Sequence, residues 1–289
     1  MQDDRRKGLL ITVSGVLVIT PDSLLVRLIS ADEWTILFWR GLLSGIAILL
    51  ALAIMQRNRF LPGLLAIGRM GLALAVMFSI GTVFFIISLE MTTVANTLFI
   101  VSTAPVFAAI MTSVFLHEAV SRRTWVTIAV TLIGVLIIAT GSVGGGPGSL
   151  LGDLAALVTA VSVAGTFTVA RRFRHVSMVP AMGISGLITA LIATAISPPA
   201  ALSQADTVYL AAMGLAVIPL SFSLMTIGPR YLPAPEVSLI LLLEAVLAPF
   251  LIWLVLAEYP GNASLLGGAV VLGALFLANL AGLRERPRR

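Results

Sequence analysis

Long apolar segments, separated by short charged or turn-forming breaks, run through the whole sequence. A helix needs about 20 apolar residues to cross the hydrocarbon core of a bilayer. Backbone polar groups in lipid must be satisfied within the protein, so such segments are expected to be helical. We therefore expect an all-α membrane protein with ten transmembrane helices, near residues 8–29, 34–55, 70–89, 93–116, 123–141, 150–170, 177–198, 207–228, 233–257 and 264–283.

The composition agrees with a chain that is solvated by lipid. Hydrophobic residues make up 59% of the sequence and charged residues 11%, against about 45–50% and about 25% in soluble domains. The net charge of +5 is explained by basic residues that flank membrane spans, so we expect no nucleic-acid partner. The sequence has no cysteine and two histidines, and we therefore expect no metal site and no cofactor.

The positions of lysine and arginine predict the orientation. Ten spans place both termini on one side of the membrane, and the loops alternate between the two sides. Because basic loops stay in the cytoplasm, we expect a multi-pass protein of the cell inner (plasma) membrane with both termini cytoplasmic. Arg27 and Arg40 fall within spans, and one side holds all the other basic residues: Arg5, Arg6, Lys7, Arg57, Arg59, Arg69, Arg122, Arg123, Arg171, Arg172, Arg174, Arg230, Arg284, Arg286, Arg288 and Arg289.

Five spans on each side of a glycine-rich stretch indicate two halves, residues 1–143 and 149–289, joined by an outward-facing linker at 144–148. A shift of 140 residues aligns Leu116 and Glu118 with a leucine and a glutamate of the second half. Because five is odd, the two halves must cross the membrane in opposite senses. Inverted repeats are typical of transporters, in which two pseudo-equivalent halves move about a site near the midplane.

Three charged residues lie deep within the predicted spans, where a charge is costly and indicates a functional site. Asp22 and Arg40 lie about 10 Å and about 9 Å from the outer ends of the first two spans, at 1.5 Å per residue. We expect them to pair or to face a common cavity, or else to form an ion pair that only fixes the two spans. Glu244 lies near the midplane of the ninth span, where it can bind an amino group or carry a proton.

Hydroxyl groups and prolines at similar depth complete the predicted substrate and coupling site. Buried hydroxyls can bind a polar substrate, although they more often bond their own backbone or pack between helices. The hydroxyl candidates are Ser79, Ser102, Thr103, Ser162 and Ser221. Prolines bend a span and free a carbonyl group, and the predicted bend or gating positions are Pro21, Pro105 and Pro219.

One motif suggests an enzyme. The segment Gly183-Ile184-Ser185-Gly186 reproduces the Gly-x-Ser-Gly pattern of rhomboid intramembrane proteases. A nucleophilic serine needs a base such as histidine within reach, and His117 and His175 both lie at predicted cytoplasmic ends. We expect no catalytic residue, and an intramembrane serine hydrolase or a non-transporting scaffold remains the alternative to a transporter.

Short motifs follow one another in a characteristic order through both halves. Phe38-Trp39-Arg40 is followed by Ala104-Pro105-Val106-Phe107-Ala108-Ala109, and the second half carries Gly152-Asp153-Leu154 and Leu243-Glu244-Ala245-Val246. In this order and spacing the chain resembles the ten-helix EamA-type members of the drug/metabolite transporter superfamily. It departs from their pattern at Ala245, where the family usually has proline.

The resemblance implies a function and a place for the site. It implies alternating-access transport of a small-molecule substrate, such as an amino acid or a similar metabolite, often outward. The expected cavity lies between spans one to four and six to nine. Ala274, Ala278 and Gly282 lie on one face of the last span at a spacing of four, which allows close helix approach, and we expect a monomer or a homodimer in the lipid bilayer.

Overall fold

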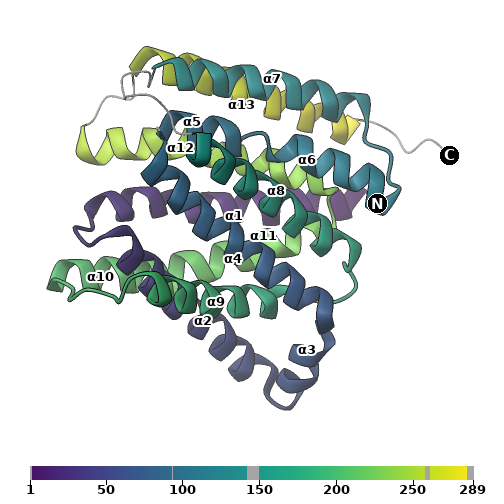
Figure 1. Cartoon of the computed structure of the whole chain (residues 1–289). Coiled ribbons are helices and arrows are strands. Elements are labelled where there is room, and N and C mark those ends of the chain that lie inside the picture. Colours follow the sequence, from purple (N-terminus) through teal and green to yellow (C-terminus); the bar gives the residue numbers. More distant parts are fainter. Residues whose placement is uncertain (1, 93, 142–149, 258–260, 285–289) are drawn as a thin grey trace.

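The computed structural model describes residues 2–92, 94–141, 150–257 and 261–284 (Figure 1). Within these residues ten helical segments are long and apolar enough to cross a membrane. The prediction of an all-α membrane protein with ten spans is confirmed. The linker predicted at 144–148 lies outside the described residues.

Eight of the ten spans contain one uninterrupted helix each, and six of these helices are α1 (Gln2–Leu28), α4 (Gly68–Met91), α7 (Arg122–Gly141), α8 (Leu150–Arg172), α9 (Val179–Ile196) and α13 (Gly261–Arg284). The ninth span, α12 (Ala234–Leu256), is also one helix, and it continues through Ala245 and contains Pro249. The second span is likewise one helix, α2 (Glu33–Gln56), and it is followed by η1 (Arg57–Arg59) and the short helix α3 (Phe60–Ala66).

The fourth and eighth spans are interrupted. The fourth consists of α5 (Val94–Val101), α6 (Ala104–Met111) and the π-helical turn η2 (Thr112–Leu116), and α5 and α6 are separated by Ser102 and Thr103. The eighth consists of α10 (Gln204–Ala212), the π-helical turn η3 (Met213–Val217), α11 (Ile218–Ile227) and η4 (Gly228–Arg230).

The three candidate prolines occupy different kinds of position. Pro105 lies in the first turn of α6, directly after the interruption of the fourth span. Pro219 lies in the first turn of α11, directly after the π-helical turn of the eighth span. Both accord with the tolerance for proline at the start of a helix. Pro21 lies inside α1, which continues for seven residues beyond it.

The helices of the two halves are paired across the bundle (Figure 1). Helix α2 packs on α9, α4 on α8, and α7 on α13, while α1 contacts both α11 and α12. The same contacts are found when each span is replaced by the corresponding span of the other half. The third span meets the sixth as the eighth meets the first, and the fourth meets the sixth as the ninth meets the first.

Glycines allow the closest of these pairings. A Cβ atom added to Gly41 of α2 would lie 2.7 Å from the carbonyl oxygen of Gly186 in α9, and one added to Gly45 would lie 2.8 Å from that of Gly183. Such backbone proximity needs small residues at a membrane helix interface. The glycines of the protease-like motif therefore serve the packing of α2 against α9.

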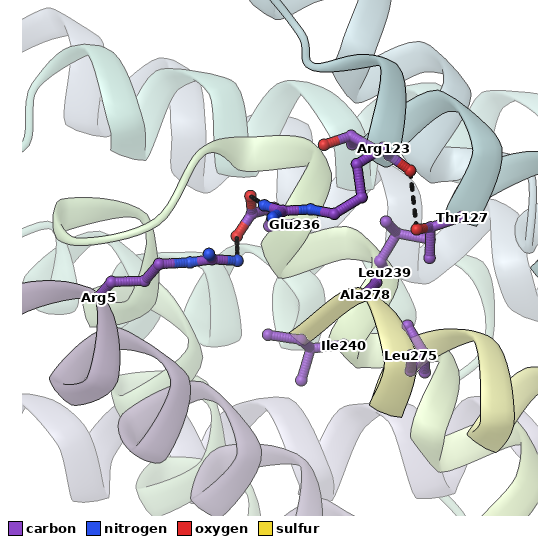
Figure 2. A pocket seen from close by; sticks show the side chains of 9 residues that line it. Arg5, Arg123, Thr127, Glu236, Leu239, Ile240, Leu275 and Ala278 are labelled. Atoms are coloured by element: carbon purple, nitrogen blue, oxygen red, sulfur yellow. Dashed lines mark hydrogen bonds and ion pairs between the residues drawn. The ribbon is translucent and has the colours of Figure 1, made fainter. Parts of the chain in front are cut away.

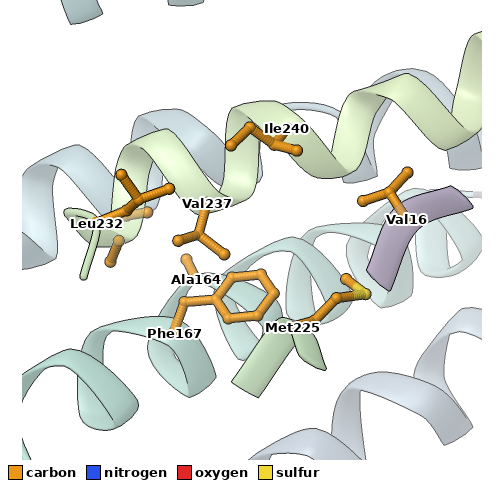
Figure 3. Packing of buried hydrophobic residues seen from close by; sticks show 9 residues of the cluster. Val16, Ala164, Phe167, Met225, Leu232, Val237 and Ile240 are labelled. Carbon is orange, nitrogen blue, oxygen red and sulfur yellow. The ribbon is translucent and has the colours of Figure 1, made fainter. Parts of the chain in front are cut away.

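An apolar cluster lies where α1, α8, α11 and α12 meet (Figure 3). Val16 of α1, Phe167 of α8, Met225 of α11 and Val237 of α12 are its larger members, and each is at most 4% exposed. Val16 precedes Asp22 by six residues and Val237 precedes Glu244 by seven. The cluster therefore lies between these acidic residues and the ends at which α1 and α12 begin.

Candidate functional site

The structure brings Asp22 and Arg40 together. Asp22 of α1 is 5% exposed, and its Oδ2 lies 2.7 Å from Nη2 of Arg40 in α2. Removing two charges from water is costly, and a short contact between opposite charges offsets part of that cost. The sequence places Asp22 and Arg40 at similar depth on adjacent spans, and in the structure they form a direct ion pair.

Glu244 is the third member of the charged group. It lies in α12, is partly buried, and is close enough to Asp22 and Arg40 for the charges of both to act on it. Within the described part of the chain, Glu244 forms no hydrogen bond and no ion pair. Two carboxyl groups thus lie inside the helix bundle near one guanidinium group, and only that of Asp22 contacts it.

The candidate hydroxyl groups are largely engaged with backbone carbonyls. Ser79 Oγ donates to the carbonyls of Ala75 and Ser185, at 2.8 Å each. The hydroxyls of Ser102, Thr103 and Ser221 donate to carbonyls three or four residues earlier in their own spans. Ser162 is 7% exposed. A substrate role for these five residues remains a prediction, and four of them have a local use.

Ser185 does not have the surroundings of a nucleophile. It is 2% exposed, its hydroxyl donates to the carbonyl of Met182 at 2.7 Å, and its own carbonyl accepts from Ser79. A catalytic serine needs a base that takes its proton. Among the described residues, the hydrogen-bond partner of this hydroxyl is a backbone carbonyl instead.

A second set of charges closes one end of the bundle, which we call the basic end because Arg5, Arg123 and Arg171 lie there. Figure 2 shows Glu236, in the first turn of α12, between two arginines. Its carboxylate lies 3.0 Å from Nη2 of Arg5 in α1 and 3.7 Å from Nη2 of Arg123 in α7. Leu239, Ile240 and Leu275 line the apolar floor of the pocket beneath these charges.

Arg171 ties further elements together at the basic end. Its side chain lies 3.2 Å from the carboxylate of Glu118, which follows the fourth span. It also donates to the carbonyl of Pro229 at 3.3 Å. Neither set of contacts was predicted, because the partners are far apart in sequence: Arg5 and Glu236 are separated by 231 positions. The sequence indicates only that these arginines and their carboxylate partners lie at the same predicted membrane face.

The opposite end is joined by hydrogen bonds between the halves. Ser30 donates to Asp206 through its backbone N–H at 3.0 Å and through its hydroxyl at 2.9 Å. Thr92 donates to Asp153 at 2.9 Å. Both ends of the bundle are therefore connected by polar contacts that cross between the halves, with the Asp22–Arg40 pair and Glu244 in between.

Ten membrane-spanning helices around buried charges of both signs define a multi-pass membrane protein of the transporter class. The chain belongs to the EamA-like transporter family, whose model matches residues 7–140 and 150–280. The family resemblance seen in the sequence is thereby confirmed, and it points to a non-enzymatic membrane transporter rather than a hydrolase.

Individual proteins agree with this assignment. The chain is 27% identical over 247 residues to the "Uncharacterized transporter YdfC" of Bacillus subtilis (strain 168), a match that covers 81% of this chain and 78% of that protein. One solved crystal structure is similar with a TM-score of 0.81 over 97% of this chain and 100% of the other, at 18% identity. That likeness supports the fold.

Proposed function

We propose that this transporter exports a small zwitterionic metabolite, such as an amino acid, from the cytoplasm by alternating access. The observation that carries the proposal is the charged group of Asp22, Arg40 and Glu244, contributed by spans one, two and nine, of which Asp22 is buried. Ionisable residues within membrane spans are rare, and they mark substrate or ion pathways.

The charges of this group match a zwitterion. The guanidinium group of Arg40 suits a carboxylate, and the carboxylates of Asp22 and Glu244 suit an ammonium group. An ion pair that only fixes α1 against α2 would account for Asp22 and Arg40. It would not account for a third charged residue, Glu244, that has no partner among the described residues.

The proposed movement involves two inverted five-helix halves, residues 1–143 and 149–289. The exchange of contact partners between the halves, in which the third span meets the sixth as the eighth meets the first, supports this arrangement. Two equivalent halves can adopt either of two related packings, and a site between them then opens to one side at a time. The sided distribution of arginines supports a cytoplasmic basic end.

Counterflow into liposomes tests the transport proposal. Purified protein is reconstituted, the vesicles are loaded with amino acids, sugars or nucleotides, and uptake of the labelled compound is followed. We expect uptake of an amino acid and not of the neutral sugars. A protein of confirmed fold that exchanges no compound in the panel would contradict transport and would favour the scaffold alternative.

Glu244→Gln tests whether the unpartnered carboxyl group takes part. An ionised Glu244 attracts the ammonium group and a protonated one does not, so wild-type transport should weaken as the pH falls. The variant should transport at a rate at least tenfold lower, with a flatter pH profile. Glu33→Gln, an exposed substitution at the start of α2, is the matched control. An unchanged profile in Glu244→Gln would remove the proposed role.

A further inference from the structure

Two buried polar atoms without a partner in the described ranges belong to Asp22 and to Trp39, the residue that precedes Arg40. Asp22 uses Oδ2 to contact Arg40, while its Oδ1 is buried and has no hydrogen-bond partner among the described residues. The indole Nε1 of Trp39, the residue before Arg40, is likewise buried and without a partner in this part of the chain. A carboxylate oxygen only accepts hydrogen bonds and an indole N–H only donates. The site therefore presents one free acceptor and one free donor.

Both atoms belong to the region where α1, α2 and the eighth span meet. Trp39 packs against an apolar cluster that contains Ile19 of α1, Met213 of η3 and Ile218 of α11. Asp22 follows Ile19 by three residues and precedes Val26, another residue packed on this cluster, by four. Residues at these spacings share one face of a helix. Asp22 thus projects from the face of α1 on which Trp39 packs.

The ring of Trp39 has a defined orientation. Its neighbour Phe38 contacts it edge to face, with ring centroids 5.1 Å apart and an interplanar angle of 77°. The partly buried indole also packs against an apolar cluster with members from α1, α2 and the eighth span. Packing of this kind holds a donor in a fixed direction. It does not supply the acceptor that a buried N–H requires.

We propose that Trp39 Nε1 and Asp22 Oδ1 are hydrogen-bonding contacts of the substrate, and that Trp39 is a specificity-determining residue of this transporter. The inference rests on the proposed function and deepens it. Trp39 donates to a carboxylate oxygen that is also held by Arg40, and Asp22 accepts from the ammonium group. Ile19, Met213 and Ile218, the buried apolar residues of the cluster against which Trp39 packs, give this contact an apolar surrounding. The substrate class is an α-amino acid with an apolar side chain.

This arrangement also links occlusion to the presence of substrate. In the structure both atoms are shielded from solvent, so closure without a substrate would bury a donor and an acceptor that have no partner, at a cost in free energy. A bound amino acid satisfies both. Since a ligand shifts an equilibrium only by its differential affinity for the two states, the loaded carrier should occlude more readily than the empty one. Exchange of substrate across the membrane should therefore be faster than net efflux.

Trp39→Phe keeps the ring and removes the donor. Labelled L-leucine is taken up by counterflow in proteoliposomes, and unlabelled L-leucine or 3-methylbutylamine, which has the same side chain and amine but no carboxylate, competes with it. Losing a hydrogen bond to a charged group should raise the half-inhibitory concentration of leucine about tenfold. The value for the amine should not change. Trp34→Phe, in the first turn of α2, is the control.

The outcomes separate the inference from the proposed function. One outcome is that the wild-type protein exchanges leucine while the ratio of the half-inhibitory concentrations of leucine and the amine is the same in Trp39→Phe as in the wild type. In that case Trp39 does not bind the carboxylate and the inference is wrong, while the transport proposal stands. If the panel yields exchange of other amino acids but not of leucine, the apolar substrate class is wrong. If no amino acid is exchanged, both proposals fail.

A second measurement serves if Trp39→Phe does not fold, as judged by size-exclusion chromatography. The other tryptophans, Trp34, Trp125 and Trp253, are replaced by phenylalanine, so that Trp39 is the sole indole. L-leucine should then shift the fluorescence emission of Trp39, and 3-methylbutylamine should shift it less. An emission spectrum that leucine leaves unchanged, in a variant that still performs counterflow, would overturn the inference.

Discussion

At the scale of single residues, three charged side chains from three spans lie near one another inside the bundle. Asp22 and Arg40 form a 2.7 Å ion pair, and Glu244 lies within the field of both. Breaking a buried pair by removing one partner leaves an uncompensated charge, which is strongly destabilising, whereas removal of both partners is often nearly neutral. Stability and transport can therefore be separated by comparing single and double substitutions.

We expect Arg40→Ala to abolish transport and to destabilise the protein by about 3–5 kcal/mol, because Asp22 is left unpaired. The double variant Asp22→Asn/Arg40→Ala should regain most of this stability and still fail to transport. Thermal unfolding in detergent and counterflow are the two measurements. Arg69→Ala, at an exposed position, is the control. A double variant that transports normally would reduce the pair to a structural role.

Asp32, which lies outside the spans, uses its carboxylate to cap a helix. Asp32 caps α2, and its Oδ1 accepts from the backbone N–H groups of Trp34 and Thr35 at 3.1 and 3.0 Å. Hydrogen bonding to Thr35, with a smaller effect of Trp34, lowers the pKa of Asp32. Its stabilising contribution is therefore present at neutral pH, and it is lost as the pH falls through the lowered pKa.

Asp32→Ala should lower the stability of the protein by about 0.5–2 kcal/mol at neutral pH, as the loss of a helix cap does. The difference from wild type should shrink in acid, where Asp32 is protonated in both states. Melting temperatures of the two proteins across a pH series test this. A difference that is independent of pH would mean that the carboxylate charge contributes nothing to the cap.

At the scale of elements, close helix pairing across the halves depends on glycine. Gly41 and Gly45 of α2 face Gly186 and Gly183 of α9. In α7 and α13, Gly134 and Gly267 are in similarly close contact with each other's helices. These are the second and seventh spans, and the fifth and tenth. Helices in equivalent positions of the two halves thus approach one another through backbone contact. In lipid the hydrophobic effect does not favour helix association, so this close packing is what stabilises the pairs.

Gly41→Ala should therefore destabilise the protein, because the new methyl group meets backbone atoms of Gly186 and Ala190 that cannot move independently. Gly273→Ala, in α13, places its methyl group in open space. It should be neutral or stabilising by up to about 1 kcal/mol through helix propensity. Thermal unfolding of the two variants compares them directly, and equal effects would contradict the role of close packing.

At the scale of the whole molecule, the basic end is closed. Glu236 joins α12 to α1 and α7, Arg171 joins the ends of the fourth and sixth spans, and the apolar cluster around Phe167 and Met225 lies further in (Figure 3). A substrate that reaches Asp22 from this end must separate these contacts. We expect the ion pairs of Glu236 to favour the conformation that is closed at the basic end.

Glu236→Gln should shift the protein toward opening at the basic end. Each partly exposed pair contributes about 0–1 kcal/mol, so the population ratio should change severalfold. The chain has no cysteine, and spin labels can therefore be placed at Arg6→Cys and Arg122→Cys, both exposed positions. Longer label distances are expected in Glu236→Gln than in Glu33→Gln. Identical distance distributions would show that Glu236 does not hold this end closed.

The features that the sequence predicts correctly are those that depend on local hydropathy. A span is recognised from consecutive apolar residues, because lipid requires a helix of nearly constant length. Arginine positions predict which span ends lie together, and the ends of α1 and α13 do meet at the pocket that Arg5 and Ala278 line. The depth of Asp22 and Arg40 follows from the fixed rise of a helix, and it made their pairing a natural hypothesis.

Only the tertiary structure decides which faces meet. Helical periodicity could not show that Glu236 lies between Arg5 and Arg123 or that Ser79 bonds the backbone of α9. It also could not show that the N–H of Trp39 has no acceptor in the part of the chain that the structure describes. Nearly every face of these helices is apolar, so the sequence carries little record of which face is turned inward. The face that is turned inward is determined by close backbone packing and by the hydrogen bonds of buried polar atoms. Both depend on contacts between residues far apart in the chain.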